Sequence, residues 1–316
     1  MVNRYRAARK GLVHNYTNRL TAFEHTPKPD SSSAQNLLIF IGGLFDGLQT
    51  VPYTDIISNA LPETWSLAQV HLSSSYTGFG TSSLLRDATE LAKCVTYFRT
   101  IKTGKIILMG HSTGCQDVME YLTGPGHKKH PAIDGGIIQA PASDREAIVM
   151  TMDPSQYLHS VAVATKMVED GGVEEIVPRV EINGVMPAPV CARRWLSLAS
   201  PYHDGDDDYF SSDLKDEQLM KTFGALPKGS PICVIFSGED EYIPKTVDKQ
   251  GQIKRWAEVA KNGEGRVDEE SSGVVDGASH NLAGNPEAVV NDLVKRVLLF
   301  LYSLSKDARG LEALLN

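Results

Sequence analysis

Short apolar runs alternate with longer amphipathic stretches along most of the chain. The apolar runs are rich in β-branched residues and are bounded by Gly, Pro, Ser or Asp, which is typical of buried strands. Six such runs cover residues 36–43, 68–72, 105–110, 133–140, 231–238 and 271–277. Two earlier runs, at 11–17 and 19–25, predict a β-hairpin with Asn18 near its turn.

The amphipathic stretches predict four long helices, at residues 83–99, 115–123, 248–262 and 286–305. In the first, the apolar residues Leu84, Ala88 and Leu91 repeat at helical spacing, and Ser82 or Ser83 is the expected N-cap. A hairpin followed by repeated strand–helix units favours a mostly parallel sheet. We therefore expect an α/β fold of about eight strands with helices on both faces.

One interval, residues 141–230, interrupts this alternation because it contains no convincing strand. It holds three helical pieces, at 145–152, 155–170 and 216–224, together with several prolines and the polar run YHDGDDDYFSSD. About 90 residues is far longer than an ordinary loop. We expect a helical lid inserted into a single domain that spans residues 1–316.

Composition narrows the class of protein. The 316 residues are 41% hydrophobic and 22% charged, as in a soluble globular protein, and no apolar run approaches the ~20 residues that span a bilayer. A net charge of −8 without a basic stripe argues against nucleic acid as a partner. The basic start lacks the apolar stretch of a secretory signal.

The four cysteines are widely spaced and form no C-x-x-C pair. Such spacing fits neither a disulfide framework nor a zinc site, and it suits a reducing compartment. We expect a cytoplasmic protein.

A candidate nucleophile lies in the segment KIILMGHSTGCQD, where Gly110 and Gly114 bracket Ser112 in the pattern G-x-S-x-G. A predicted strand leads directly into this pattern and a predicted helix leaves it, which is the context of a nucleophile elbow. The turn is so tight that the flanking residues need to be nearly free of side chains. Ser112 is therefore the expected nucleophile, and the N–H of Thr113 is one expected donor to an oxyanion.

A serine nucleophile requires a base and an acid that orients the base, and in this architecture the acid precedes the histidine. His280 follows the last predicted strand, whereas His203 lies in the polar run of the insertion. The loop GEDEYIP after the strand 231–238 offers three carboxylates. Asp240 is the preferred acid because it precedes Ile-Pro by three residues, and Glu241 is the alternative.

The second oxyanion donor is expected in the loop IGGLFDGL, which follows the strand 36–43. The backbone N–H of Leu44 is the candidate. Asp46, close behind it, has two interpretations that the sequence leaves open: it meets a substrate amine, or it caps the turn.

These motifs resemble a known family. The segments GHSTGCQD, IGGLFDGL, SSSYTGFGTSSL (73–84) and QAPASDREA (139–147) are similar to those of the fungal siderophore esterases, which have the α/β-hydrolase fold. The likeness runs from about residue 36 to residue 300 and is weakest in the insertion. It implies a serine esterase that cleaves the ester bonds of fusarinine-type hydroxamate siderophores, for iron release or siderophore turnover. It places nucleophile, acid and base on Ser112, Asp240 and His280.

The resemblance implies a small-molecule ester substrate and no cofactor, and a serine triad needs no metal. The same machinery also serves carboxylesterases, thioesterases and acyltransferases, and a non-catalytic binding protein on this fold is a further alternative. Fusarinine C keeps free amino groups, so we hypothesise that the acidic run attracts them. Its members are Asp204, Asp206, Asp207 and Asp208, and a solvated acidic loop is the competing interpretation.

Overall fold

The structure, a computed structural model, describes residues 8–26 and 33–305. It contains one eight-stranded sheet in the order β1-β2-β4-β3-β5-β6-β7-β8. The strands are β1 (Gly11–Asn15), β2 (Thr21–His25), β3 (Asn36–Ile41), β4 (Trp65–Val70), β5 (Ile106–His111), β6 (Gly135–Gln139), β7 (Ile232–Ser237) and β8 (Gly273–Val275).

Strand direction follows the expectation from the sequence. β1 and β2 form the antiparallel hairpin, β2 joins β4 antiparallel, and all pairs from β4 to β8 are parallel. Because parallel strands end at the same edge, the loops after β3, β5, β7 and β8 meet there. This edge collects the predicted site.

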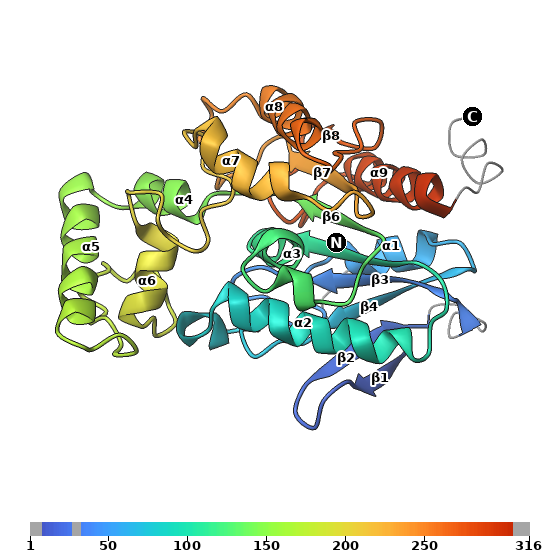
Figure 1. Ribbon diagram of the computed structural model, residues 1–316, viewed down its shortest axis with the longest axis horizontal. Coiled ribbons are helices and arrows are strands. Elements are labelled where there is room, and N and C mark those ends of the chain that lie inside the picture. The colour runs from blue at the N-terminus through green and yellow to red at the C-terminus, as the bar shows by residue number, and fades with distance from the viewer. Residues whose placement is uncertain (1–7, 27–32, 306–316) are drawn as a thin grey trace.

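Helices cover both faces of the sheet (Figure 1). The helices are α1 (Thr54–Ala60), α2 (Leu84–Arg99), α3 (Gly114–Thr123), α8 (Lys249–Asn262) and α9 (Glu287–Ser305). Alternate strand residues face opposite cores: Leu37 and Ile39 pack with α2, α3 and α8, whereas Leu38 and Phe40 pack with α1 and α9. This double covering explains why the central strands read as continuous apolar runs.

The chain between β6 and β7, residues 140–231, is a helical insertion. It carries α4 (Asp144–Thr151), α5 (Pro154–Glu169), α6 (Ala192–Ala199), α7 (Asp216–Thr222) and a 3₁₀ turn, Phe223–Ala225. Its β-structure is one isolated bridge between Ile176 and Cys191. In Figure 1, α5 and α6 lie beyond one end of the sheet. They share a separate apolar cluster that includes Trp195 and also Phe79 of the 3₁₀ turn Gly78–Thr81.

Local signals account for most element boundaries. The side chain of Ser83 caps α2 by accepting from the N–H of Arg86, and Asp153 caps α5, which begins at Pro154. The helices α1 and α6 were not predicted, and β4 begins at Trp65 rather than at residue 68. Neither of those helices has a side-chain cap.

Among the described residues, no helix combines the length and apolar character that a membrane span requires.

Candidate active site

Ser112 occupies the turn between β5 and α3. Its φ of 54° lies in the left-handed region, which is strained for a residue with a side chain. A Cβ at Gly110 would lie 2.1 Å from the carbonyl oxygen of Gly114, and one at Gly114 would lie 2.5 Å from that of Ile41. The close approach therefore requires both glycines, and it exposes Ser112 at the N-terminus of α3.

The loop after β3 packs directly against the serine. A Cβ at Gly43 would lie 2.6 Å from the Cβ of Ser112, so only glycine fits there. Within the described residues, the N–H groups of Leu44 and Thr113 donate no hydrogen bond. The loop is held by Asp46, whose carboxylate accepts from the N–H of Gly43 at 2.9 Å and from the hydroxyl of Thr50 at 2.8 Å. These contacts favour the turn-capping interpretation of Asp46.

Asp240 and His280 meet at the ends of the loops after β7 and β8. Nδ1 of His280 lies 2.9 Å from Oδ1 and 2.8 Å from Oδ2 of Asp240. Both residues are buried, each with 6% of its surface exposed. Glu241 has a different partner, because its Oε2 accepts from the backbone N–H of His280 at 2.9 Å. With Nδ1 facing Asp240, Nε2 is the nitrogen left to exchange a proton with a serine.

His111, which no sequence motif indicated as a site residue, lies beside His280. The ring centroids of His111 and His280 are 4.9 Å apart. Burial, followed by the nearby charge of His280, lowers the pKa of His111 to about 4, so this imidazole is neutral at pH 7. Its Nδ1 donates to Oε1 of Gln139 at 2.6 Å, and the same oxygen accepts from the hydroxyl of Tyr53 at 2.6 Å.

Gln139 links this group to the histidine loop. Its Nε2 donates to the hydroxyl of Ser237 at 3.1 Å, and that hydroxyl lies 3.3 Å from the carbonyl oxygen of His280. Gln139, the last residue of β6, thus connects through hydrogen bonds to His111 at the end of β5 and to Ser237 at the end of β7.

Ser112 and His280 line one cavity of about 390 Å³. The insertion supplies one wall of it, including Asp144, Ile148 and Met186. The loop after β3, with Leu44 and Phe45, and the loop after β7, with Glu241 and Tyr242, supply further lining. This volume fits a small organic molecule.

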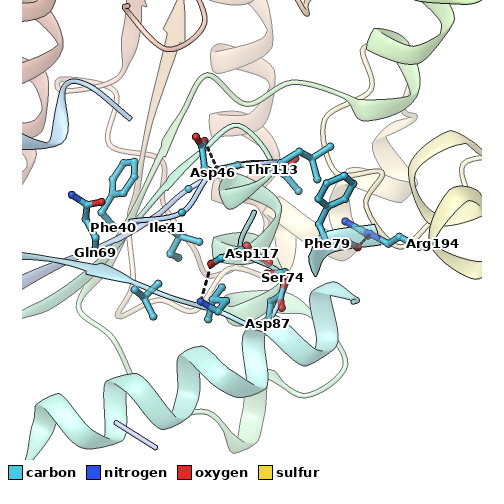
Figure 2. A pocket seen from close by; sticks show the side chains of 17 residues that line it. Phe40, Ile41, Asp46, Gln69, Ser74, Phe79, Asp87, Thr113, Asp117 and Arg194 are labelled. Carbon is cyan, nitrogen blue, oxygen red and sulfur yellow. Dashed lines mark hydrogen bonds between the residues drawn. The ribbon is translucent and has the colours of Figure 1, made fainter. Parts of the chain in front are cut away.

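A second, smaller cavity of about 30 Å³ is lined in part by the loop after β3 (Figure 2). Asp87, Asp117 and Arg194 face it from α2, α3 and α6. Oδ1 of Asp117 is buried and has no hydrogen-bond partner among the described residues. Burial raises the pKa of Asp87 to about 7, against the lowering effects of a hydrogen bond with Ser74 and of the charge of Arg194.

Three of the four aspartates in the acidic run of the insertion bond to other side chains of the protein. Asp207 is 2% exposed and forms an ion pair with Arg194, so it faces neither solvent nor the large cavity. Asp208 bonds to His203 at 2.7 Å, and Asp204 bonds to the hydroxyl of Ser200. Asp206 is exposed, but the hollow that it lines does not include Ser112. Asp207 and Asp208 are therefore engaged within the protein, whereas Asp204 and Asp206 are exposed and line the same hollow.

No group of three or more His, Cys, Asp or Glu side chains is arranged to hold a metal ion in the part of the chain that is described. The four cysteines are all free and buried.

The sheet order, the elbow after β5 and the insertion before β7 define an α/β-hydrolase-fold protein. The chain belongs to the family described as Protein of unknown function (DUF1749), whose model matches residues 1–302. It is 38% identical to the fusarinine C esterase sidJ of Aspergillus fumigatus, over 94% of this chain and 96% of that protein. It is 37% identical to an esterase of Emericella nidulans, over 95% of this chain and 94% of that protein.

Solved structures agree with this assignment. The siderophore hydrolase EstB from Aspergillus fumigatus superimposes with a TM-score of 0.83 at 37% identity, covering 95% of this chain and 99% of that one. A monoglyceride lipase variant from Saccharomyces cerevisiae, at 12% identity and a TM-score of 0.57, covers 94% and 96% and shares the fold alone. The resemblance found in the sequence motifs is confirmed.

Proposed function

We propose that this protein is a serine esterase that hydrolyses the ester bonds of fusarinine-type hydroxamate siderophores. The observation that carries the proposal is the pair formed by His280 and Asp240 at the wall of the cavity that Ser112 also lines. The relatives named as fusarinine C esterase and siderophore hydrolase support the substrate class.

In the proposed mechanism, Oγ of Ser112 attacks the ester carbonyl carbon while Nε2 of His280 takes the serine proton. The N–H groups of Leu44 and Thr113 donate to the oxyanion of the tetrahedral intermediate. Asp240 holds the imidazole in the tautomer that leaves Nε2 free and stabilises the imidazolium. The C–O bond to the alcohol then breaks, and His280 returns the proton to the leaving oxygen.

The acyl-enzyme is then hydrolysed by the reverse sequence of proton transfers. Water loses a proton to His280 and attacks the acyl carbon, and Oγ of Ser112 leaves with that proton, which releases the carboxylic acid. No cofactor enters either half. The residues of the insertion form the wall that faces the reacting ester, and we propose that the segment acts as a lid.

We further propose that the reaction takes place in the cytoplasm and contributes to iron release or siderophore turnover. The four free, buried thiols support a reducing compartment. Fractionation of cells that produce the protein at its natural level tests this location.

The decisive experiment is mass-spectrometric product analysis with fusarinine C and its triacetylated form, using wild type and Ser112→Ala. Linear ester fragments that form only with wild type support the proposal. Absence of cleavage, with fluorophosphonate labelling of wild type retained, would reject the siderophore substrate and keep the serine hydrolase. Absence of labelling as well would reject the catalytic assignment.

A further inference from the structure

The cavity of about 390 Å³ that Ser112 lines has an excess of acidic side chains. The residues that line it include Asp46, Asp144 and Glu241 and no lysine or arginine. Its two histidines are His280, which pairs with Asp240, and the neutral His111. A cavity of this kind favours a substrate with a positive charge over one with a negative charge.

Two of the three carboxylates hold backbone groups of the loops around the site. Asp46 accepts from the N–H of Gly43 and the hydroxyl of Thr50 and so holds the loop after β3. Glu241 accepts from the N–H of His280. Asp144 is the third, and its position differs from that of the other two.

Asp144 is the first residue of α4 and is partly buried. Its Oδ2 accepts from Nε2 of Gln116 at 2.9 Å, and its Oδ1 lies 3.5 Å from the hydroxyl of Thr113. Gln116 is itself fixed by a hydrogen bond of 3.2 Å to the carbonyl oxygen of Ala142. The carboxylate is therefore oriented by neutral donors that lie within four residues of Ser112.

No cation pairs with Asp144 in the described part of the chain. Arg194 acts on it electrostatically, but the guanidinium is bonded to Asp207 and to the carbonyl oxygen of Phe79. Burial, with Asp207 as the second cause, raises the pKa of Asp144 to about 7. A ligand cation beside it would restore the charged form, because an opposite charge lowers the pKa of a carboxyl group.

We propose that Asp144 determines specificity by binding the α-ammonium group of an α-aminoacyl ester substrate. In such an ester the amino group lies on the carbon next to the reacting carbonyl. Thr113, whose N–H is the proposed oxyanion donor, contacts Asp144 through its side chain, so a carbonyl in the oxyanion site brings that amino group near Asp144. The proposal rests on the proposed function, since free α-amino groups distinguish fusarinine C from its triacetylated form.

The test compares wild type with Asp144→Asn on paired substrates at neutral pH. One pair is fusarinine C and triacetylfusarinine C, and the other is the ethyl esters of norvaline and N-acetylnorvaline. We expect Asp144→Asn to lower kcat/KM for the free-amine member about 10–100-fold and to change the acetylated member less than about threefold, the range for a charge-assisted hydrogen bond. The ratio within a pair does not depend on the fraction of active protein.

Glu146→Gln is the matched control, because Glu146 lies on the same helix and bonds to Ser212 outside the cavity lining. It should leave both ratios unchanged. An equal loss on both members of a pair with Asp144→Asn would overturn the proposal and indicate positioning through Thr113 and Gln116. Unchanged ratios would also overturn it. If neither siderophore is cleaved but the simple esters show the shift, the substrate proposal fails and the assignment of Asp144 stands.

Discussion

Asp240 and His280 are 40 positions apart in sequence, yet both carboxylate oxygens of Asp240 lie within 2.9 Å of Nδ1 of His280. Glu241, one position further on, points instead to the backbone N–H of the same histidine. The two neighbouring carboxylates thus hold one imidazole through its ring and its main chain. Substitution of Asp240 and substitution of Glu241 are therefore expected to affect the reaction rate differently.

Asp240→Asn should lower kcat by a factor on the order of 10³–10⁴, because an amide at this position favours the wrong tautomer of His280. Glu241→Gln keeps a hydrogen-bond acceptor for the N–H of His280 and should change kcat less than about tenfold. Steady-state kinetics on a chromogenic ester measure both, with circular dichroism as the control for folding. A larger loss for Glu241→Gln would transfer the role of the acid to Glu241.

Ser112→Gly should be more stable than Ser112→Ala by about 1 kcal/mol, although both variants lose activity. Alanine keeps the side-chain clash that a φ of 54° imposes, whereas glycine adopts this conformation freely. Urea unfolding of the two variants measures the difference. Equal stabilities would show that the elbow stores no strain at this residue.

The sheet and the tight turn at Ser112 were predictable because their signals are local. β5 and α3 follow directly from the apolar run and the glycine pattern around Ser112. The short helix α1, with 7 residues and no side-chain cap, lacks such a signal. The same holds for α6, which begins after the uncapped Cys191.

Contacts between distant residues were predicted only where the fold itself dictates them. The order of loops along a hydrolase sheet brings Asp240 toward His280, and this follows from the sequence. No local pattern indicates that Tyr53, His111 and Gln139 share hydrogen bonds, because their pairing depends on how β5, β6 and the loop before α1 pack. The burial of Asp207 likewise depends on its ion pair with Arg194, and the local sequence of the acidic run does not indicate that pair.

His111 makes the folded protein less stable in acid. The pKa is about 6.5 in an unfolded chain and about 4 in the fold, so between these values the unfolded state binds more protons and stability falls as pH falls. His25, with a pKa also lowered to about 4, acts in the same direction. For His111 alone the loss from neutral pH to about pH 5 is about 2 kcal/mol.

His111→Asn should therefore lose about 2 kcal/mol less than wild type between about pH 7.5 and about pH 5. Urea unfolding at the two pH values measures the loss for each protein. The comparison concerns the change with pH, so a uniform destabilisation by the substitution does not affect it. An equal loss in both proteins would show that His111 titrates normally.

The positive charge of Arg194 acts on four buried carboxyl groups. Burial raises the pKa of each of them: Asp87, Asp117, Asp144 and Asp207. Because their pKa values lie above those of the unfolded chain, the native state binds more protons, and stability falls as pH rises. For Asp87 and Asp144, whose pKa values are raised to about 7, the fall runs from about pH 4 to about pH 7. Removing Arg194 raises these pKa values further and steepens the fall.

Arg194→Met should therefore cost about 3–5 kcal/mol of unfolding free energy, the range for breaking a buried ion pair, with the larger loss at pH 8 and the smaller at about pH 5.5. Arg193→Met, which removes the neighbouring and more exposed pair with Glu174, should cost about 1 kcal/mol or less at either pH. Arg194→Lys should recover part of the loss because it keeps the charge. If Arg194→Met is destabilised equally at both pH values, the carboxyl groups around it do not titrate in this range, and packing alone accounts for the arginine.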